Sequence, residues 1–295
     1  MKHTDTLPDL YTIWDYNDLN ATRERFLQIL SEVEQRADKD YVLQLKTQIA
    51  RTYSIQSDFD NAHRILDEVE ARLSDDLPVV KVRYWLERGR TFNSAEKKET
   101  ALPLFKQAYE LAKELGADFY TIDAAHMIAI VLPEQTEKEK WNLIGVEIAE
   151  QSQDERARGW LGSLYNNLGW DFFEQKRYAE ALERFEKALD YQREIGNPER
   201  INIALWCVAK GYRHVDRLDE ALEIQKALLK EYEQSGTPDG YVFEELGELY
   251  LLKNEPEKSH VFFARAYTEL SKDSWLVKNE SERLTRLQKL AGQDS

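Results

Sequence analysis

The side chains that could do covalent or metal chemistry in this chain are few and stand apart from one another. The five histidines, at positions 3, 63, 126, 214 and 260, include no pair three or four residues apart, the spacing of a metal site on a helix. Neither a glycine-rich phosphate loop nor a Gly-x-Ser-x-Gly motif occurs. The one cysteine, Cys207, lies inside a helical pattern beside Trp206, which favours a buried structural thiol over a nucleophile. We therefore expect no enzyme activity, no metal and no cofactor.

A second group of residues has the composition of a binding surface. Trp206, Lys210 and Arg213 follow one another at intervals of four and three, and Trp170 and Phe173 stand three apart. Each set therefore lies on one side of a helix. Exposed aromatic rings next to arginine are typical of binding hot spots. The alternative is that Trp170 and Trp206 pack against each other and only fill space.

The elements that carry these residues repeat about every forty positions. Each repeat has two helical halves, and one position of the second half can be followed through the chain: Ala62, Ala101, Trp141, Ala181, Ala221 and Ser259. The intervals between these positions are 39, 40, 40, 40 and 38 residues. A period held this closely predicts a repeat architecture of six units.

The clearest unit, residues 165–199, shows how one repeat is built. Apolar residues recur at helical spacing in both halves, and a short polar break separates the halves. Small residues such as Ala181 and Ala188 let the two helices approach closely, while Phe185 fills the space beside them. Gly196, and Gly236 one period later, stand where a left-handed helix end favours glycine. One helical pair cannot bury its own apolar face, so neighbouring pairs must stack.

These units resemble the tetratricopeptide repeat, most closely in NNLGW at 166–170 and EALERFEKALDYQREIGN at 180–197. The resemblance spans residues 41–271. The period near 40 is longer than the 34 residues usual for that family, and is similar to the extended repeats of kinesin light chain, LGN-type adaptors and Rap-type regulators. Two departures are Trp141 and Ser259, which stand where alanine is usual.

The resemblance implies an all-α, right-handed α-solenoid of six helix-turn-helix repeats with capping helices at both ends. We place an N-terminal cap, a partial repeat, at 1–40, the six repeats at 41–274 and a C-terminal cap at 275–295. Within the caps, we expect helices over 19–36 and 275–291, the latter covering the last repeat.

The resemblance also implies that the first helices of the repeats line a concave groove in which ligands lie. We expect an extended or helical peptide with acidic and apolar residues to bind there. Asn166 and Asn167 would bind its backbone, as asparagine does in the resembled adaptors. The predicted peptide-binding residues are Arg83, Arg90, Asn166, Asn167, Trp170, Phe173, Trp206, Lys210 and Arg213.

Charge and composition exclude several function classes. The 295 residues carry 40 Lys and Arg against 55 Asp and Glu, a net charge of −15, which opposes general binding to nucleic acid or to anionic membranes. We find no signal peptide and no apolar stretch of about 18 residues that could span a bilayer, and we expect a cytoplasmic protein. The roughly 40 residues before the first full repeat are too few for the phosphatase bundle of Rap-type regulators.

These observations predict a non-catalytic scaffold that binds a protein or peptide. The alternative is a regulatory receptor for a small signalling peptide, in which binding changes the pitch of the superhelix. A third interpretation is a purely structural spacer in a larger assembly.

Overall fold

The computed structural model describes residues 7–34 and 39–292, and the regular structure within them is helical, without a strand. This confirms the predicted all-α fold. The chain divides into two compact units at Trp160 and Leu161, a division that the repeat period did not predict. We call them unit 1 and unit 2 and describe each by itself.

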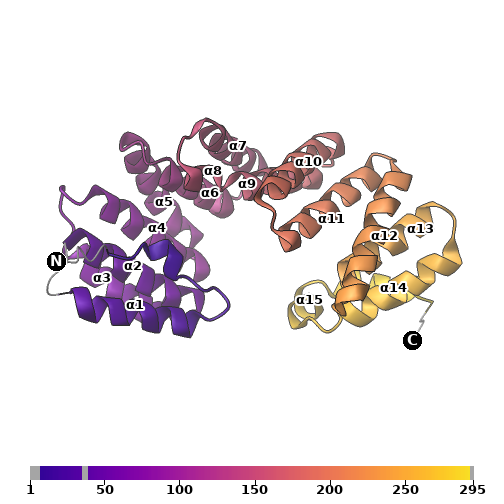
Figure 1. Cartoon of the computed structure of the whole chain (residues 1–295), viewed down its shortest axis with the longest axis horizontal. Helices are drawn as coiled ribbons and strands as arrows, with labels where there is room; N and C mark the ends of the chain where they lie inside the picture. Colours follow the sequence, from indigo (N-terminus) through magenta and orange to yellow (C-terminus); the bar gives the residue numbers. More distant parts are fainter. Residues whose placement is uncertain (1–6, 35–38, 293–295) are drawn as a thin grey trace, which may run out of the picture. The chain divides into compact units, whose positions relative to one another are not determined.

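Unit 1 consists of helical hairpins that stack on one another (Figure 1). The hairpins are α2 with α3, α4 with α5, and α6 with α7, and α1 packs on α2. The bounds are η1 (a 3-10 helix, Leu10–Ile13), α1 (Leu19–Val33), α2 (Lys39–Ile55), α3 (Phe59–Glu70), α4 (Pro78–Ser94), α5 (Lys98–Glu114), α6 (Asp118–Val131), α7 (Gln135–Gln151) and α8 (Glu155–Arg158). The short α8, which packs on α6, was not predicted.

Unit 2 repeats the same arrangement with the hairpins α9 with α10, α11 with α12, and α13 with α14. The bounds are α9 (Leu161–Glu174), α10 (Tyr178–Ile195), α11 (Pro198–His214), α12 (Leu218–Ser235), α13 (Gly240–Leu252), α14 (Pro256–Leu270), α15 (Ser274–Asn279) and α16 (Ser281–Leu290). Both glycines predicted at helix ends adopt the left-handed conformation, with φ of 77° at Gly196 and 71° at Gly236.

The turn inside five of the six hairpins is built in the same way. Each contains one non-glycine residue with φ near 60°: Ser57, Glu96, Lys176, Asp216 or Asn254. The next residue donates its backbone N–H to the carbonyl of an aromatic residue five positions earlier, as Arg177 does to Phe172 at 2.9 Å. This bond closes the helix end in the manner of a Schellman motif. The short polar breaks seen in the sequence are therefore helix ends of one type.

The six anchor positions all lie on second helices, and all are buried except Trp141, which is half-buried. In three hairpins, a glycine on the first helix lies directly against a phenylalanine on the second: Gly89 and Phe105, Gly169 and Phe185, Gly247 and Phe263. The three phenylalanines are fully buried. The close approach of the two helices that the small residues predicted is therefore present.

The two ends differ in detail from the expected caps. The N-terminal helix α1 covers most of the expected 19–36 segment, and Thr22 and Phe26 are buried in it. The expected C-terminal helix is divided into α15 and α16, because the backbone leaves the helical conformation at Glu280. Positions 1–6, 35–38 and 293–295 of the expected caps lie outside the described residues.

Candidate functional site

An aromatic row crosses the first helices of unit 2. Trp170 and Phe173 of α9 have ring centroids 5.3 Å apart, Trp170 lies 6.0 Å from Trp206 of α11, and Trp206 lies 6.1 Å from Tyr241 of α13. The indole nitrogen of Trp206 also donates to the carbonyl of Tyr241 at 3.2 Å. The structure therefore brings the three predicted aromatic residues together. They contact one another and are half-buried rather than sealed from solvent.

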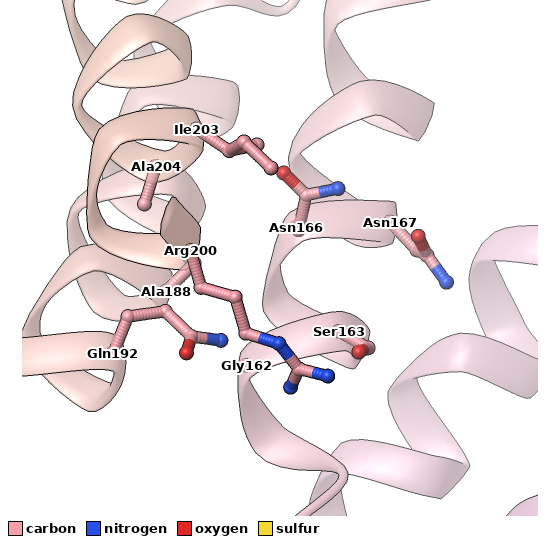
Figure 2. A pocket seen from close by; sticks show the side chains of 9 residues that line it. All are labelled: Gly162, Ser163, Asn166, Asn167, Ala188, Gln192, Arg200, Ile203 and Ala204. Carbon is pink, nitrogen blue, oxygen red and sulfur yellow. The ribbon is translucent and has the colours of Figure 1, made fainter. Parts of the chain in front are cut away.

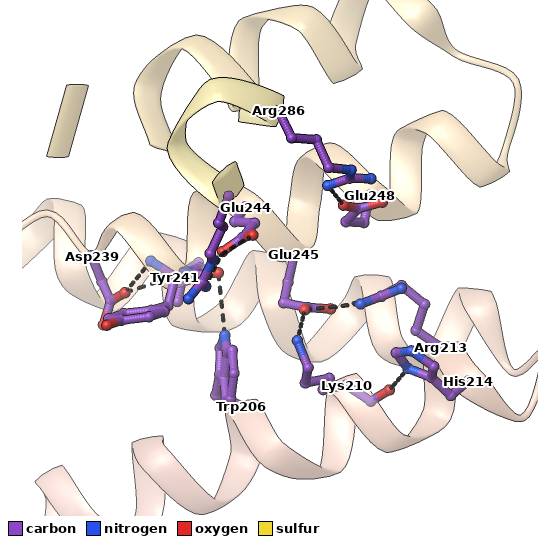
Figure 3. A network of polar contacts seen from close by, with 12 residues as sticks. Trp206, Lys210, Arg213, His214, Asp239, Tyr241, Glu244, Glu245, Glu248 and Arg286 are labelled. Carbon is purple, nitrogen blue, oxygen red and sulfur yellow. Dashed lines mark hydrogen bonds and ion pairs between the residues drawn. The ribbon is translucent and has the colours of Figure 1, made fainter. Parts of the chain in front are cut away.

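The two cations predicted beside this row share one buried carboxylate (Figure 3). Glu245 of α13 accepts from Lys210 at 2.6 Å and from Arg213 at 2.7 and 3.0 Å. The residue is only 1% exposed. Burial alone would raise its pKa, but Lys210 and Arg213 lower the pKa to about 2. Lys210 and Arg213 are therefore committed to an internal ion triad.

Glu245 was not among the residues singled out from the sequence. The available signal was its place between the apolar core positions Phe243 and Leu246, where a charged residue needs a partner. The ion triad also explains why Lys210, 4.9 Å from the Trp206 ring centroid, keeps a fixed place beside the aromatic row.

A pocket of about 290 Å³ lies between α9, α10 and α11 (Figure 2). The predicted Asn166 and Asn167 line it, together with Arg200 and Ile203, which the sequence did not single out. Arg200 extends from α11 toward Gly162 and Ser163 of α9. The other lining residues are Ala188, Gln192 and Ala204. The walls therefore offer amides, a hydroxyl and one guanidinium.

A second pocket, of about 200 Å³, lies along the same helix α11. Ile203 and Trp206 line it with Tyr241 and Val242 of α13, and its remaining walls are Asn202, Tyr232 and Asp239. Ile203 lines both pockets and is 52% exposed, so its apolar side chain is open to a ligand at the edge of each. The pockets thus form one surface around Ile203, polar on the α9 side and aromatic on the α13 side.

The predicted residues of unit 1, Arg83 and Arg90, lie on helix α4, where Arg83 is buried and Arg90 is half-buried. Arg90 donates to Glu87 at 2.8 Å and also to Asp123 of α6. Arg83 donates to Gln44 at 3.0 Å and to the Tyr120 hydroxyl at 3.1 Å. Neither residue belongs to the surface around Ile203, since both lie in the other unit.

Groups that could do catalysis are unfavourably placed. Burial raises the pKa of the Cys207 thiol to about 12, in keeping with a structural thiol. Burial likewise lowers the pKa of His63, His126 and His214. Among residues 7–34 and 39–292, no three His, Cys, Asp or Glu side chains are grouped to hold a metal ion, and no helix there is long and apolar enough to cross a membrane.

Comparison with known proteins gives one family match and a consistent fold. Residues 162–195, which form α9 and α10, match the tetratricopeptide repeat model. No curated protein sequence matches the chain.

Solved structures that are similar include the apo form of RapI, with a TM-score of 0.74 and 16% identity over 97% of this chain and 81% of that one. A Signal Transduction ATPase with Numerous Domains, carrying a tetratricopeptide repeat sensor, from Pyrococcus horikoshii gives a TM-score of 0.72 and 16% identity over 90% of this chain. This chain spans only 42% of that protein's length.

A third similar structure contains the nearly identical tetratricopeptide-like repeats of a putative kinesin light chain from Podospora anserina. It gives a TM-score of 0.55 and 15% identity, and the match covers 69% of this chain and 100% of that one. These likenesses concern the fold, because all the identities are low. Taken with the six helical hairpins and the matching repeat at 162–195, they show that the chain has the α-solenoid fold of tetratricopeptide-repeat proteins.

Proposed function

We propose that the chain is a non-catalytic peptide-binding protein and that its ligand lies on the surface around Ile203 in unit 2. The tetratricopeptide fold generally mediates protein binding, which supports the general assignment. The observation that carries the location is the pair of pockets that meet at the exposed Ile203. An apolar side chain of a ligand would lie between Ile203 and Trp206, where it would be removed from water.

The preference for acidic ligands rests on Arg200 rather than on Lys210 and Arg213. Those two cations already share Glu245, so a ligand carboxylate would have to compete with a buried one. Arg200 is exposed and forms no ion pair with any acidic side chain that the structure describes. A guanidinium in this position can take a carboxylate with two parallel hydrogen bonds. Asn166, beside it in the same pocket, can hydrogen-bond a peptide backbone.

Substitution of Arg200 and Trp206 by alanine is expected to weaken peptide binding at least tenfold without unfolding the protein. Arg200 is exposed and Trp206 is half-buried, and neither takes part in the buried ion triad. The measurement is a selection of acidic, apolar peptides on the wild type from a random library, followed by affinity titration of the selected peptides with R200A/W206A.

The matched control is Arg193→Ala on α10, because Arg193 is an exposed arginine that lines neither pocket. It should bind the selected peptides as the wild type does. The unfolding curve of R193A should match that of the wild type, and that of R200A/W206A should show that the variant is fully folded under the conditions of the titration. If R200A/W206A binds the selected peptides with unchanged affinity, the ligand does not lie around Ile203.

A further inference from the structure

The first-helix face of unit 1 is already covered, by residues 8–16 of the same chain. The hydroxyl of Tyr41 on α2 donates to the carbonyl of Pro8 at 2.9 Å, and the indole nitrogen of Trp14 donates to Gln48 of α2 at 3.0 Å. Leu10, between them, is buried. We call residues 8–16 the N-terminal strap. It lies on α2, α4 and α6, which carry the residues that the repeat pattern assigned to the groove of this unit.

Two aromatic side chains of the strap, three positions apart, make its contacts with cations of this face. The ring of Tyr11 lies 5.2 Å from the guanidinium carbon of Arg83 and 5.2 Å, edge to face, from the ring of Phe119. The guanidinium carbon of Arg51 lies 5.7 Å from the ring of Trp14. Each strap aromatic therefore lies on one arginine of a first helix, at the distance of a cation–π contact.

Arg83 and Arg88 are the buried arginines among the described residues of unit 1, and Arg88 pairs with Asp67 and Glu70 whereas Arg83 makes no ion pair. Arg51 and Arg90 pair with Glu87, and Arg90 also pairs with Asp123, so the two acids of this face are used. Arg83 is 4% exposed and donates only to the uncharged Gln44 and Tyr120.

Burying a guanidinium that no carboxylate contacts costs free energy. The guanidinium carbon of Arg83 lies 5.2 Å from the ring centroid of Tyr11 and 5.9 Å from that of Tyr120. The charge of Arg83 therefore lies against two uncharged rings. The Nε and Nη2 atoms of Arg83 have no acceptor. The strap therefore satisfies this residue only in part.

The strap also leaves space unfilled. A cavity of about 200 Å³ remains beside it, lined by Tyr11 and Trp14 of the strap and by Arg83, Tyr120 and Trp160 among others. The pocket is partly open to solvent, so the strap leaves room beside it for atoms of a ligand.

We propose that this face of unit 1 is a second peptide-binding surface, specific for a segment with two aromatic side chains three residues apart, and that the N-terminal strap occupies it until such a segment displaces the strap. Arg83 and Arg51 each receive one aromatic ring. An incoming segment with an acceptor group next to its first aromatic residue would also bond Nε and Nη2 of Arg83, which the strap does not.

The test uses a fluorescent peptide with the sequence of residues 7–18, LPDLYTIWDYND, and measures its binding by fluorescence anisotropy. In the wild type, the tethered strap competes at an effective concentration on the order of millimolar. The full-length variant Tyr11→Ala/Trp14→Ala lacks this competitor. We therefore expect it to bind the peptide at least tenfold more tightly than the wild type does.

Three controls make the result specific. Thr12→Ala/Asn17→Ala changes two exposed residues near the same segment and should bind the peptide as weakly as the wild type. A peptide with alanine at the positions of Tyr11 and Trp14 should bind none of the proteins. Adding Arg83→Gln to the double variant should remove the gained affinity while its unfolding curve shows that it is folded.

Equal binding of the peptide by the wild type and the double variant would overturn the proposal, and so would binding that survives loss of both aromatic rings from the peptide. This result is independent of the surface around Ile203. R200A/W206A should leave binding of the strap peptide unchanged, so failure of one proposal can be told from failure of the other.

Discussion

Replacing Glu245 by glutamine is expected to lower the free energy of unfolding of unit 2 by about 3 kcal/mol or more. The carboxylate is 1% exposed and holds both Lys210 and Arg213 within 3.0 Å. Glutamine has nearly the same shape but no charge, so two cations would remain partly buried without a counter-ion. Breaking a buried ion pair by removing one partner typically costs about 3–5 kcal/mol.

Chemical denaturation at pH 7 measures this effect, and Glu220→Gln is its matched control. Glu220 also receives an arginine, Arg217, but the pair is exposed to solvent at the start of α12. Exposed pairs contribute little, so this variant should unfold at nearly the wild-type midpoint. An E245Q protein as stable as E220Q would mean that Lys210 and Arg213 do not depend on the buried carboxylate.

The same residue predicts how stability depends on pH. The pKa of Glu245 is lowered from its ordinary value of 4.5 to about 2 in the folded protein. A depressed pKa in the folded state contributes stability that is fully present above about 4.5 and is lost as the pH falls toward 2. A shift of this size corresponds to about 3 kcal/mol, since one pKa unit is about 1.4 kcal/mol.

The pH prediction is checked on the difference between two proteins. The stability gap between the wild type and E245Q should be constant from pH 7 down to about 5 and should narrow between about 4.5 and 2. All other carboxyl groups are common to both proteins, so their titration largely cancels. A gap that does not change with pH would assign the cost of E245Q to lost packing or hydrogen bonds rather than to charge.

The fold could be predicted from the sequence because its signals are local and repeated. Helical spacing, the forty-residue period and the glycines at 196 and 236 each act within one hairpin or between neighbours. The structure confirms them, because stacked hairpins place equivalent residues in equivalent surroundings. The aromatic residues Trp170 and Trp206 lie on successive first helices but not at equivalent positions, because Lys210 is the residue one period after Trp170. Their pairing follows from the stacking of α9 and α11 and from the side of each helix on which they lie.

Only those site residues whose position follows from the helical spacing and the forty-residue period could be predicted from the sequence. Whether Lys210 and Arg213 are free depends on Glu245, 35 and 32 residues away, at a position the repeat pattern assigns no binding role. The N-terminal strap lies outside the repeat altogether, so no period indicated that Tyr11 would lie against Arg83. Partners of buried charges and the placement of a non-repeating segment are set by tertiary contacts, which a periodic pattern does not contain.

Gly169→Ala is expected to lower the free energy of unfolding by about 1–3 kcal/mol, the cost of overpacking a core, although alanine is the better helix former. A Cβ at Gly169 would lie 2.4 Å from two ring carbons of Phe185, which is fully buried on α10. The ring cannot move without displacing its neighbours in a close-packed interior. Glycine is therefore required at this position by the distance between two helices rather than by its own backbone conformation.

Gly211→Ala on α11 is the matched substitution, because the nearest atom there is the flexible end of Leu182, at 3.1 Å. It should cost less than Gly169→Ala, as the leucine can rotate away. The cause is tested by combining Gly169→Ala with Phe185→Leu. The losses of unfolding free energy in the two single variants should sum to more than the loss in the double variant, because leucine at position 185 leaves room for the added methyl group. Strictly additive costs would show that the Cβ of residue 169 and the ring of residue 185 do not meet, and the tight pairing of helices in each hairpin would need another origin.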